Sequence, residues 1–414
     1  MTHKIIRHPI FKSPYLWAIL IRLVFMVLVP IALQGDAVDY IQMARNLAAG
    51  HGFSRCYSEP FVATAQRPPL YPLALALMYL IGLGSEFGAV LLNMICDLVS
   101  MRLARMWGDE LKLTWAKKIP WVIGLCPLLI TYGMYPTTEN MSITLFFLAL
   151  VLTYRTRPLQ AGLAWGLLSL CRSYFLLFPI VLGIFGPTRR GPRSWKRGPL
   201  TILIVASFIA PTCWMVRNKI VLNRIAFTQT SMVGWQTNQG LCYANFDWWN
   251  PAQVEKLVSD PVMQRIMSSH CSSESEIAGF DSQAKAEVYK CVTEHPLATV
   301  RNVLTKGVHL FINWGLFMPY NRVPFIIQQI INAFLLLYWL CVIRILFTHR
   351  QKGGGLQDAV HFSLLNIGYI FLVTLPFAVD ARYLLGPFLT LLIAILEMVQ
   401  TPVGIFRAGL KKGT

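Results

Sequence analysis

Residues 15–33 read YLWAILIRLVFMVLVPIAL, an almost uninterrupted apolar run near the start of the chain. A helix that crosses a lipid bilayer needs roughly 20 consecutive apolar residues, because lipid offers no partners for backbone polar groups. The run therefore predicts a membrane-spanning helix. No cleavage site of the A-x-A type follows it, and the chain continues directly into an acidic motif. We therefore expect a retained first span and not a cleaved signal peptide.

Similar runs recur along the chain. Of its 414 residues, 55% are hydrophobic and 14% are charged, and a soluble domain of this length could not hide so much apolar surface. The other runs of spanning length are 86–106, 117–133, 138–154, 199–216, 323–347, 357–378 and 384–400. The stretch 158–186 is too long for one helix and short for two, which favours a tight hairpin broken near Arg172. The expected fold class is an all-α, polytopic helical membrane protein.

Two shorter apolar segments decide the number of spans. Segment 70–83 follows two prolines, and segment 303–319 is interrupted by Asn313, Gly315 and Pro319. We expect both to be partial or interfacial helices, which leaves about ten spans at ~20 residues for each crossing. If both segments cross, the number rises to about twelve.

The formal net charge of +18 is distributed as in a membrane protein. Its basic residues fall in short segments between apolar runs, which is the positive-inside pattern of cytoplasmic loops. They are Lys4, Arg7, Lys12, Arg102, Arg105, Lys112, Lys117, Lys118, Arg155, Arg157, Arg189, Arg190, Arg193, Lys196, Arg197, His349, Arg350, Lys352, Arg407, Lys411 and Lys412. This pattern predicts a cytoplasmic N-terminus. No basic stretch is interleaved with exposed aromatic residues in a soluble domain, so we expect no nucleic-acid partner.

The same argument divides the chain into three parts. These are an N-terminal transmembrane module (1–216) with a first outer loop (34–69), an outer segment (217–302), and C-terminal transmembrane helices (303–414). A short link around 379–383 also lies outside. The outer segment is too small for an independent enzyme domain, and we expect it to cap the outer face.

Four cysteines fall in the segments expected outside. They are Cys56, Cys242, Cys271 and Cys291. In an oxidising compartment they would form one or two disulfides, and four cysteines allow three pairings. Their spacing is not that of a zinc site.

An acidic motif, GDAVDY, follows the first span at 35–40. Helical spacing places Asp36, Asp39 and Tyr40 on neighbouring positions of one face. Two interpretations are open and can hold together. In one, Asp36 caps a helix over 37–49, with Asp39 in a capping-box-like position. In the other, the carboxylate faces a substrate at the membrane surface.

Several arginines and a second acidic residue lie at the ends of the later predicted helices. Arg67 is followed by two prolines that stiffen the chain; arginine suits bidentate contact with phosphate, although snorkelling to lipid headgroups is the alternative. Glu139 opens the span 138–154, either as a favourable charge at a helix N-terminus or as part of a polar cavity. Arg172 lies among apolar residues, where a central charge costs at least ~2.5 kcal/mol, so it needs a partner. The remaining candidates at the outer boundaries are Arg217, Arg382 and Tyr383.

Carboxylates and arginines gathered at the outer membrane surface are suited to glycosyl transfer. An acceptor hydroxyl needs a general base, which a carboxylate can supply, and a departing lipid phosphate is stabilised by fixed cations. Lipid-phosphate donors hold their sugar at the bilayer surface, where Asp36, Arg67 and Arg382 are predicted to meet. The chain has no P-loop and no dinucleotide fingerprint.

In order and spacing, these motifs resemble the GT-C superfamily of polyprenyl-phosphate-sugar-dependent glycosyltransferases. The nearest branch contains bacterial relatives of protein O-mannosyltransferases and the lipid A aminoarabinose transferases, and the resemblance covers most of the chain. The RPPLYP sequence at 67–72 is its most specific match, and 35–47 resembles the first outer-loop motif. Weaker matches are 138–139, 170–172, 214–218, 294–296 and 382–383.

The resemblance implies a GT-C fold of about 10–12 transmembrane helices with outer-face juxtamembrane helices, in the bacterial plasma (inner) membrane. It implies an inverting reaction with Asp36 as the catalytic carboxylate and Arg67 on the donor phosphate. Our hypothesis adds Arg172, Arg382 and Tyr383 to the phosphate site, with Asp39, Tyr40, Glu139 and Arg217 in support. The implied partners are a polyprenyl-phosphate-sugar donor, membrane lipids, and a hydroxyl acceptor on a lipid, an envelope glycan or a protein.

One departure from the family pattern concerns the acidic pair. Many relatives carry Asp-Glu where this chain has Asp36 and Ala37, so either Asp39 compensates or the acceptor differs. Some relatives also need a divalent metal. Here a metal site would have to be built from Asp36, Asp39 or Glu139 without a His or Cys cluster, so we expect no cofactor besides the lipid-linked donor.

Two rival functions make different predictions. A transporter or lipid flippase commonly shows paired broken helices and inverted repeats, and neither is evident in this sequence. A non-catalytic scaffold subunit should tolerate loss of Asp36 and Arg67 together.

Overall fold

Helix is the main secondary structure in the part of the chain that the structure describes. This computed structural model describes residues 12–28, 35–84, 86–187, 195, 197–228, 233–242, 274–312, 333, 339–340, 342, 354–377 and 381–400. Within these ranges there is no strand, and one isolated antiparallel bridge joins Ser54 to Ala63 in the first outer loop. The expected span 323–347 lies almost entirely outside the described residues, as do Cys271 and residues 379–380 of the last outer link.

The described helices follow one another along the chain in the order given below. The N-terminal module contains α2 (Pro14–Leu28), α3 (Asp36–Ala48), α4 (Leu70–Leu80), α5 (Glu86–Glu110), η2 (Ala116–Lys118), α6 (Ile119–Gly124), α7 (Pro127–Gly133), α8 (Glu139–Tyr154), α9 (Pro158–Ser169), η3 (Ser173–Phe175), α10 (Phe178–Phe185) and α11 (Arg197–Leu222). The rest of the described chain contains α12 (Val233–Leu241), α15 (Glu274–Glu294), α16 (Pro296–Ile312), α18 (Gly355–Thr374), η6 (Ala381–Leu384) and α19 (Leu385–Gln400).

Three helices of the described chain are long and apolar enough to cross a membrane by length and composition. They are α5, α11 and α18, and they correspond to the expected spans 86–106, 199–216 and 357–378. The other apolar helices are shorter, among them α2, α4 and α8. The expectation of an all-α membrane protein is confirmed at this level. Helix α4 ends at Leu80, which agrees with a partial helix over 70–83.

The expected span 117–133 is not one helix. It divides into α6 and α7, and the break falls at Cys126, whose backbone is extended with ψ 115°. Pro127 causes the break, because a proline lacks the N–H that would continue the helix and disfavours helical geometry in the residue before it. Apolar composition alone therefore overestimated the helix length here.

The stretch 158–186 is broken where the sequence predicts. Helix α9 ends at Ser169 and α10 begins at Phe178, and Arg172 lies between them with an extended backbone (φ −138°, ψ 100°). Helix α9 packs closely on α11 through a Gly-x-x-x-Gly pattern. A Cβ atom at Gly162 would lie 2.4 Å from the Leu203 carbonyl oxygen, so only glycine allows this approach.

The main core surrounds α8 and is rich in aromatic rings. Phe146 contacts Phe147, Trp165 and Phe362, with ring centroids 5.7, 6.1 and 5.8 Å away. The buried indole of Trp165 donates to the hydroxyl of Thr153 at 3.2 Å. These contacts join α8 and α9 to α18, so the N-terminal module and the C-terminal helices share one core.

A buried ion pair ties α2 to the same bundle. Arg22 Nε lies 2.7 Å from Asp97 Oδ2, and the two side chains are 1% and 0% exposed. Arg22 also donates to the Gly124 carbonyl at 2.9 Å, and Asn140 donates to the second Asp97 oxygen at 2.7 Å. One network of polar contacts therefore links helices α2, α5, α6 and α8.

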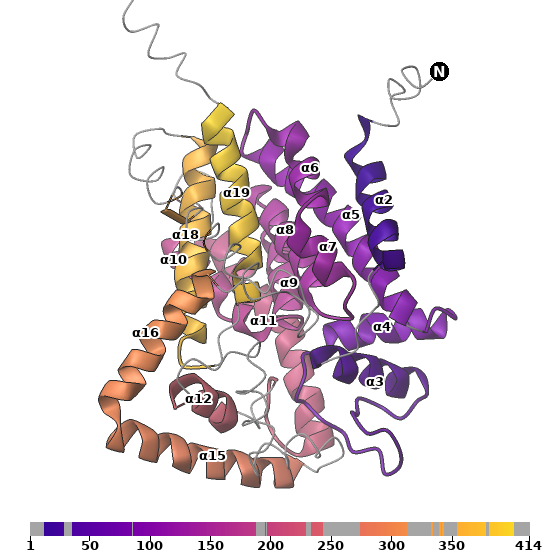
Figure 1. Ribbon diagram of the computed structural model, residues 1–414, viewed down its shortest axis with the longest axis vertical. Coiled ribbons are helices and arrows are strands. Elements are labelled where there is room, and N and C mark those ends of the chain that lie inside the picture. The colour runs from indigo at the N-terminus through magenta and orange to yellow at the C-terminus, as the bar shows by residue number, and fades with distance from the viewer. Residues whose placement is uncertain are drawn as a thin grey trace, which may run out of the picture.

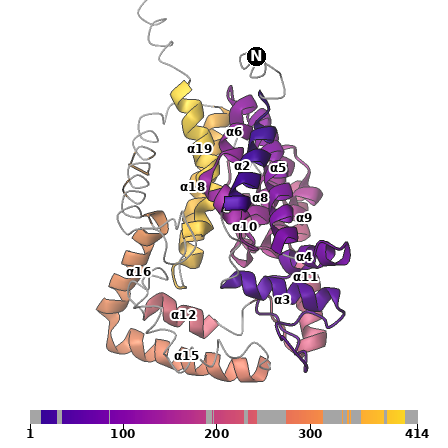
Figure 2. The same ribbon diagram turned by 45° about the vertical axis from the view of Figure 1, so that its right-hand side comes forward.

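The segments expected on the outer side gather at one end of the molecule. Helices α3, α12 and α15 lie at the lower end in both views, whereas α6 lies at the upper end (Figures 1 and 2). Helix α16 rises from this lower end toward α18 (Figure 1), and the rings of Phe311 and Phe371 join the two helices. The lower end carries the residues of the candidate site.

Candidate active site

The site begins at the first residue of α3. Gly35 occupies the N-cap position with φ 55°, a backbone angle that favours glycine, and Asp36 is the first helical residue. Because the N-cap is a glycine, no side chain caps the helix there. The interpretation in which Asp36 caps α3 is therefore wrong, and its carboxylate is directed to other partners.

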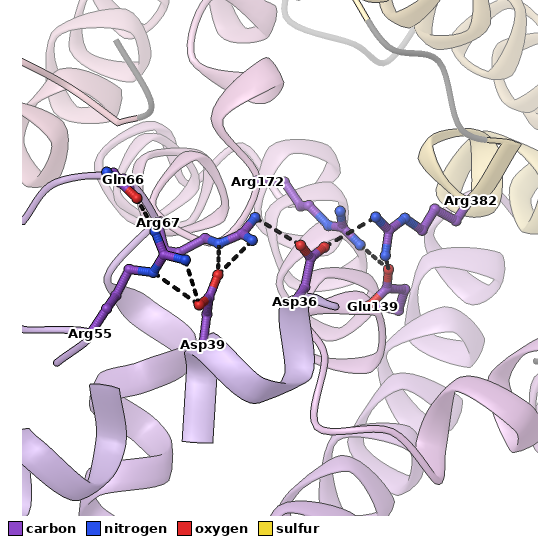
Figure 3. A network of polar contacts seen from close by, with 8 residues as sticks. All are labelled: Asp36, Asp39, Arg55, Gln66, Arg67, Glu139, Arg172 and Arg382. Carbon is purple, nitrogen blue, oxygen red and sulfur yellow. Dashed lines mark hydrogen bonds and ion pairs between the residues drawn. The ribbon is translucent and has the colours of Figure 1, made fainter. Parts of the chain in front are cut away.

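Arg67 bridges the two carboxylates of α3 (Figure 3). Its Nη1 lies 2.8 Å from Asp36 Oδ1, and its Nε and Nη2 lie 2.9 and 2.7 Å from Asp39 Oδ2. Pro69 precedes α4 directly, so the guanidinium is held close to a helix start. Its Cζ atom also lies 5.9 Å from the centroid of the Tyr40 ring. Arg67 therefore forms ion pairs inside the protein, and the snorkelling alternative does not describe it.

Arg55 supplies a further cation that the sequence analysis missed. Its Nη2 lies 2.8 Å from Asp39 Oδ1, and its Nη1 donates to Gln66 Oε1 (Figure 3). One signal could have found it. Arg55 is a basic residue in a loop expected outside, where the positive-inside pattern disfavours basic residues unless they have a specific role.

On the other side of Asp36, two arginines meet Glu139. Glu139 is the first residue of α8 and is 1% exposed. Its Oε1 pairs with Arg172, from the break between α9 and α10, and with Arg382 Nη1 at 3.2 Å. The sequence predicts that Arg172 needs a partner, and in the structure that partner is Glu139.

Arg382 connects the two halves of the site. While its Nη1 contacts Glu139, its Nη2 lies 3.1 Å from Asp36 Oδ2 (Figure 3). Asp36 and Arg382 are 346 positions apart in the sequence. Tyr383, the next residue in η6, places its ring centroid 5.9 Å from Arg172 Cζ and 5.2 Å from the ring of Tyr174. The structure thus brings together residues from the start, the middle and the end of the chain.

Arg217 is the predicted residue that lies apart from these ion pairs. It donates to the Thr64 carbonyl at 3.1 Å and to Asn218 Oδ1 at 2.9 Å. Its Cζ atom lies 4.9 Å from the ring of Trp214 and 5.6 Å from that of Phe53. Arg217 therefore fastens the first outer loop to α11, which is a supporting position.

We call the seven charged residues of the site the arginine–carboxylate cluster. They are Asp36, Asp39, Arg55, Arg67, Glu139, Arg172 and Arg382. Four guanidinium groups face three carboxylates, so the cluster carries an excess positive charge. The side chains of Asp36, Arg67 and Arg382 are 25%, 22% and 18% exposed, which leaves this part of the cluster within reach of a ligand.

The arginines keep the two aspartates ionised. Burial favours the neutral form of Asp36, but the charges of Arg67, Arg382 and Arg172 outweigh it, so its pKa lies well below the usual range. Burial opposes ionisation of Asp39 too, and Arg67 and Arg55 lower its pKa in the same way. An anionic ligand that draws the arginines away would make both carboxylates stronger bases.

Metal and thiol chemistry find little support in this donor set. Among the described residues, no group of three or more His, Cys, Asp or Glu side chains could hold a metal ion, and each carboxylate of the cluster is paired with at least one arginine. Cys242 and Cys291 are both in the reduced form in this structure. Cys56 is buried, and its sulfur accepts a hydrogen bond from the Val62 N–H at 3.4 Å.

Comparison with protein-family models, with curated proteins and with solved structures finds no match for this chain. The resemblance to the GT-C superfamily therefore stays a prediction that rests on the motifs.

Proposed function

We propose that this protein is an inverting glycosyltransferase of the GT-C type, which moves a sugar from a polyprenyl-phosphate carrier to a hydroxyl acceptor. The observation that carries the proposal is the joint contact of Arg67 and Arg382 with the partly exposed carboxylate of Asp36. A carboxylate and an excess of guanidinium groups at one end of a helical bundle supply both a base and a phosphate site. In this proposal the enzyme has about 10–12 spans in the bacterial inner membrane, its N-terminus is cytoplasmic and its active site faces outward.

The reaction needs one bond to form while another breaks. The acceptor oxygen attacks the anomeric carbon, its proton passes to Asp36, and the bond from that carbon to the phosphate oxygen breaks. The sugar leaves the carrier with inversion, and the polyprenyl phosphate departs as an anion. Arg67 and Arg382 stabilise the charge that develops on this phosphate.

Substrate binding would also activate the base. In the ligand-free protein, Arg67 and Arg382 hold Asp36 ionised and weakly basic. A phosphate anion competes for the same guanidinium groups, and bidentate arginine contacts to phosphate are strong. As these contacts form, the attraction that lowers the Asp36 pKa weakens, and the carboxylate becomes a better proton acceptor.

The direct test is sugar transfer by the purified protein. We would incubate it with synthetic polyprenyl-phosphate mannose and polyprenyl-phosphate aminoarabinose, and follow the release of polyprenyl phosphate in the presence of lipid, glycan and peptide acceptors. We expect release that depends on an acceptor and disappears in Asp36→Asn. Full activity in that variant would refute the assigned base.

A second assay separates enzyme from transporter. The protein would be reconstituted into liposomes, and movement of the labelled donor between leaflets would be compared with sugar transfer. Transport without transfer would favour a flippase. Mass spectrometry of envelope glycans and glycoproteins after gene deletion would identify the acceptor.

A further inference from the structure

Helices α12 and α15 pack side by side in a regular register. At the start of α12, the N–H groups of Gly234 and Trp235 both donate to Asp281 Oδ1, at 2.5 and 3.3 Å. One turn later, Asn238 Nδ2 donates to Glu287 Oε2 at 2.8 Å. The two helices therefore run in the same direction, and successive turns of α12 contact successive turns of α15.

The next step of this register brings two cysteines together. Cys242 is four residues after Asn238, and Cys291 is four residues after Glu287. Residues four apart lie on one helix face, so the face that carries the hydrogen bond also carries the thiols. The Cys291 side chain is also close enough to act on the ionisation of the Cys242 thiol.

Helix α16 holds both cysteines from a third side. The Cys291 sulfur lies 3.9 Å from the hydroxyl of Thr299, and Asn302 Nδ2 lies 3.5 Å from the Cys242 carbonyl oxygen and 3.1 Å from that of Leu241. Thr299 and Asn302 are three positions apart, so they share one face of α16. The positions of the two cysteines are therefore fixed by contacts among three helices, α12, α15 and α16.

The raised pKa of the Cys242 thiol favours a disulfide that resists reduction. Burial, with the neighbouring Cys291 thiol, raises the pKa of Cys242 to about 12, while the Lys306 ammonium group opposes this shift. A thiol of high pKa is a poor leaving group in thiol–disulfide exchange. A disulfide formed here would resist reduction, as a structural bond does.

We propose that Cys242 and Cys291 form a structural disulfide that links the end of α12 to α15. The bond arises by exchange with an oxidised dithiol protein, that is, one that carries a disulfide. The thiolate of one cysteine attacks a sulfur of that disulfide and forms a mixed disulfide, and the second cysteine thiolate then displaces the bound sulfur. Two protons and two electrons pass from the cysteine pair to the oxidant, which leaves as a dithiol.

The disulfide would stabilise a contact between α12 and residues 376–377, which precede Arg382 in the sequence. Gly240, two residues before Cys242, packs so closely on the backbone of 376–377 that a Cβ atom would lie 2.1 Å from the Pro376 carbonyl oxygen. Helix η6, which carries Arg382, begins four residues after Phe377. Fixing the end of α12 therefore also fixes its contact with Pro376 and Phe377.

Peptide mapping without reduction tests the pairing in the full chain. Thiols would be blocked with iodoacetamide during lysis, and the protein purified from its own membranes and digested with trypsin. The sequence separates the three relevant cysteines into the peptides 225–256, 266–285 and 291–301. We expect a linked pair of 225–256 and 291–301 that reduction separates.

Matched variants make the result specific. In Cys291→Ser, Cys242 should become alkylated and the linked pair should disappear. In Cys213→Ser, which removes an exposed cysteine of α11, the link should remain. Alkylation of both peptides in the unreduced wild-type protein, or a link of either one to 266–285, would overturn the proposal. Because the readout is a covalent bond, it is independent of sugar transfer.

Discussion

Two groups of arginines and carboxylates in the described chain differ in stoichiometry and in access. The Arg22–Asp97 pair is one cation against one anion, 1% and 0% exposed, with further hydrogen bonds to neighbouring helices. The arginine–carboxylate cluster has four cations against three anions, and Asp36 is 25% exposed. The same residue types thus form a closed contact in one place and an open one in the other.

The difference indicates what each group is for. A buried pair with balanced charge and satisfied oxygens joins helices, and removing one partner leaves an uncompensated charge. A cluster with excess charge and partial exposure can exchange an internal partner for a ligand. We therefore expect substitutions in the buried pair to change stability and substitutions in the cluster to change activity.

The largest expected effect is on catalysis, in Asp36→Asn. Sugar transfer should fall about 10³-fold, because the acceptor loses its general base. The apparent melting temperature should change little, since Arg67 keeps Asp39 and Arg382 keeps Glu139 as partners. Release of polyprenyl phosphate measures the activity, and scanning fluorimetry in detergent measures the stability.

The control for this variant is Glu110→Gln, which removes the ion pair with Arg155 outside the cluster. It should keep wild-type transfer. Equal losses in Asp36→Asn and Glu110→Gln would mean that the assay reports general damage and would remove the contrast between the two groups.

The next effect is on stability, in Asp97→Ala. Losing one partner of the buried pair should lower the free energy of unfolding by about 3 kcal/mol, because Arg22 stays buried and charged. The double variant Arg22→Met with Asp97→Leu should recover much of that loss, since no charge is left uncompensated. If Asp97→Ala instead abolished transfer at an unchanged melting temperature, the buried pair would belong to the functional machinery.

Within the cluster, Arg382→Gln should lower transfer about 10²-fold, as expected for removing one fixed donor to a developing anion. Binding of polyprenyl phosphate alone should weaken in parallel, which calorimetry can measure. Arg217→Gln is the matched arginine outside the ion pairs, and its affinity for polyprenyl phosphate should stay unchanged. Equal weakening in both variants would contradict the separation of a phosphate site from a supporting residue.

A smaller effect is expected where the outer helices meet the core, in Gly240→Ala. The added Cβ atom would clash with the Pro376 carbonyl oxygen. Such overpacking typically lowers the free energy of unfolding by about 1 to 3 kcal/mol. Gly279→Ala is the matched control in α15, because nothing lies within 4 Å of the added atom. The control should be neutral or slightly stabilising in a melting experiment, and a destabilised control would show that any added methyl group disturbs these helices.

The smallest expected effect is that of mild acid on the wild-type protein. The pKa of Asp36 is depressed, so the folded carboxylate stays ionised as the pH falls through its ordinary value. The stability that this charge contributes is fully present above that value and is lost as the pH falls from it toward the depressed pKa. The ratio kcat/KM, which reports the free enzyme, should stay flat from neutral pH to about pH 5. In Arg382→Gln the acid limb should move upward. A wild-type limb in the ordinary carboxyl range, assigned to Asp36, would contradict the ion pairing.

Local rules explain which parts of the fold were predictable. Spanning-length apolar runs led to α5, α11 and α18, and the charged residue in an apolar stretch led to the break at Arg172. The same rules would have divided 117–133 at Pro127, because the effect of proline on its preceding residue is local. Composition alone predicts one helix over 117–133 and overestimates its length, because composition does not register where the proline stands.

By itself, the sequence determined that this chain is helical and apolar enough for a membrane, and that Asp36 and Arg67 lie at helix boundaries. Those properties depend on hydrophobic runs, glycines and prolines that act within a few residues. Sidedness also predicted that Asp36, Arg67 and Arg382 meet at one surface. Only the tertiary structure decided that Arg382 pairs directly with Asp36 across 346 positions, that Arg55 joins Asp39, and that Arg217 contacts the Thr64 carbonyl. Ion pairs between distant segments depend on how the helices pack, and no local pattern specifies that arrangement.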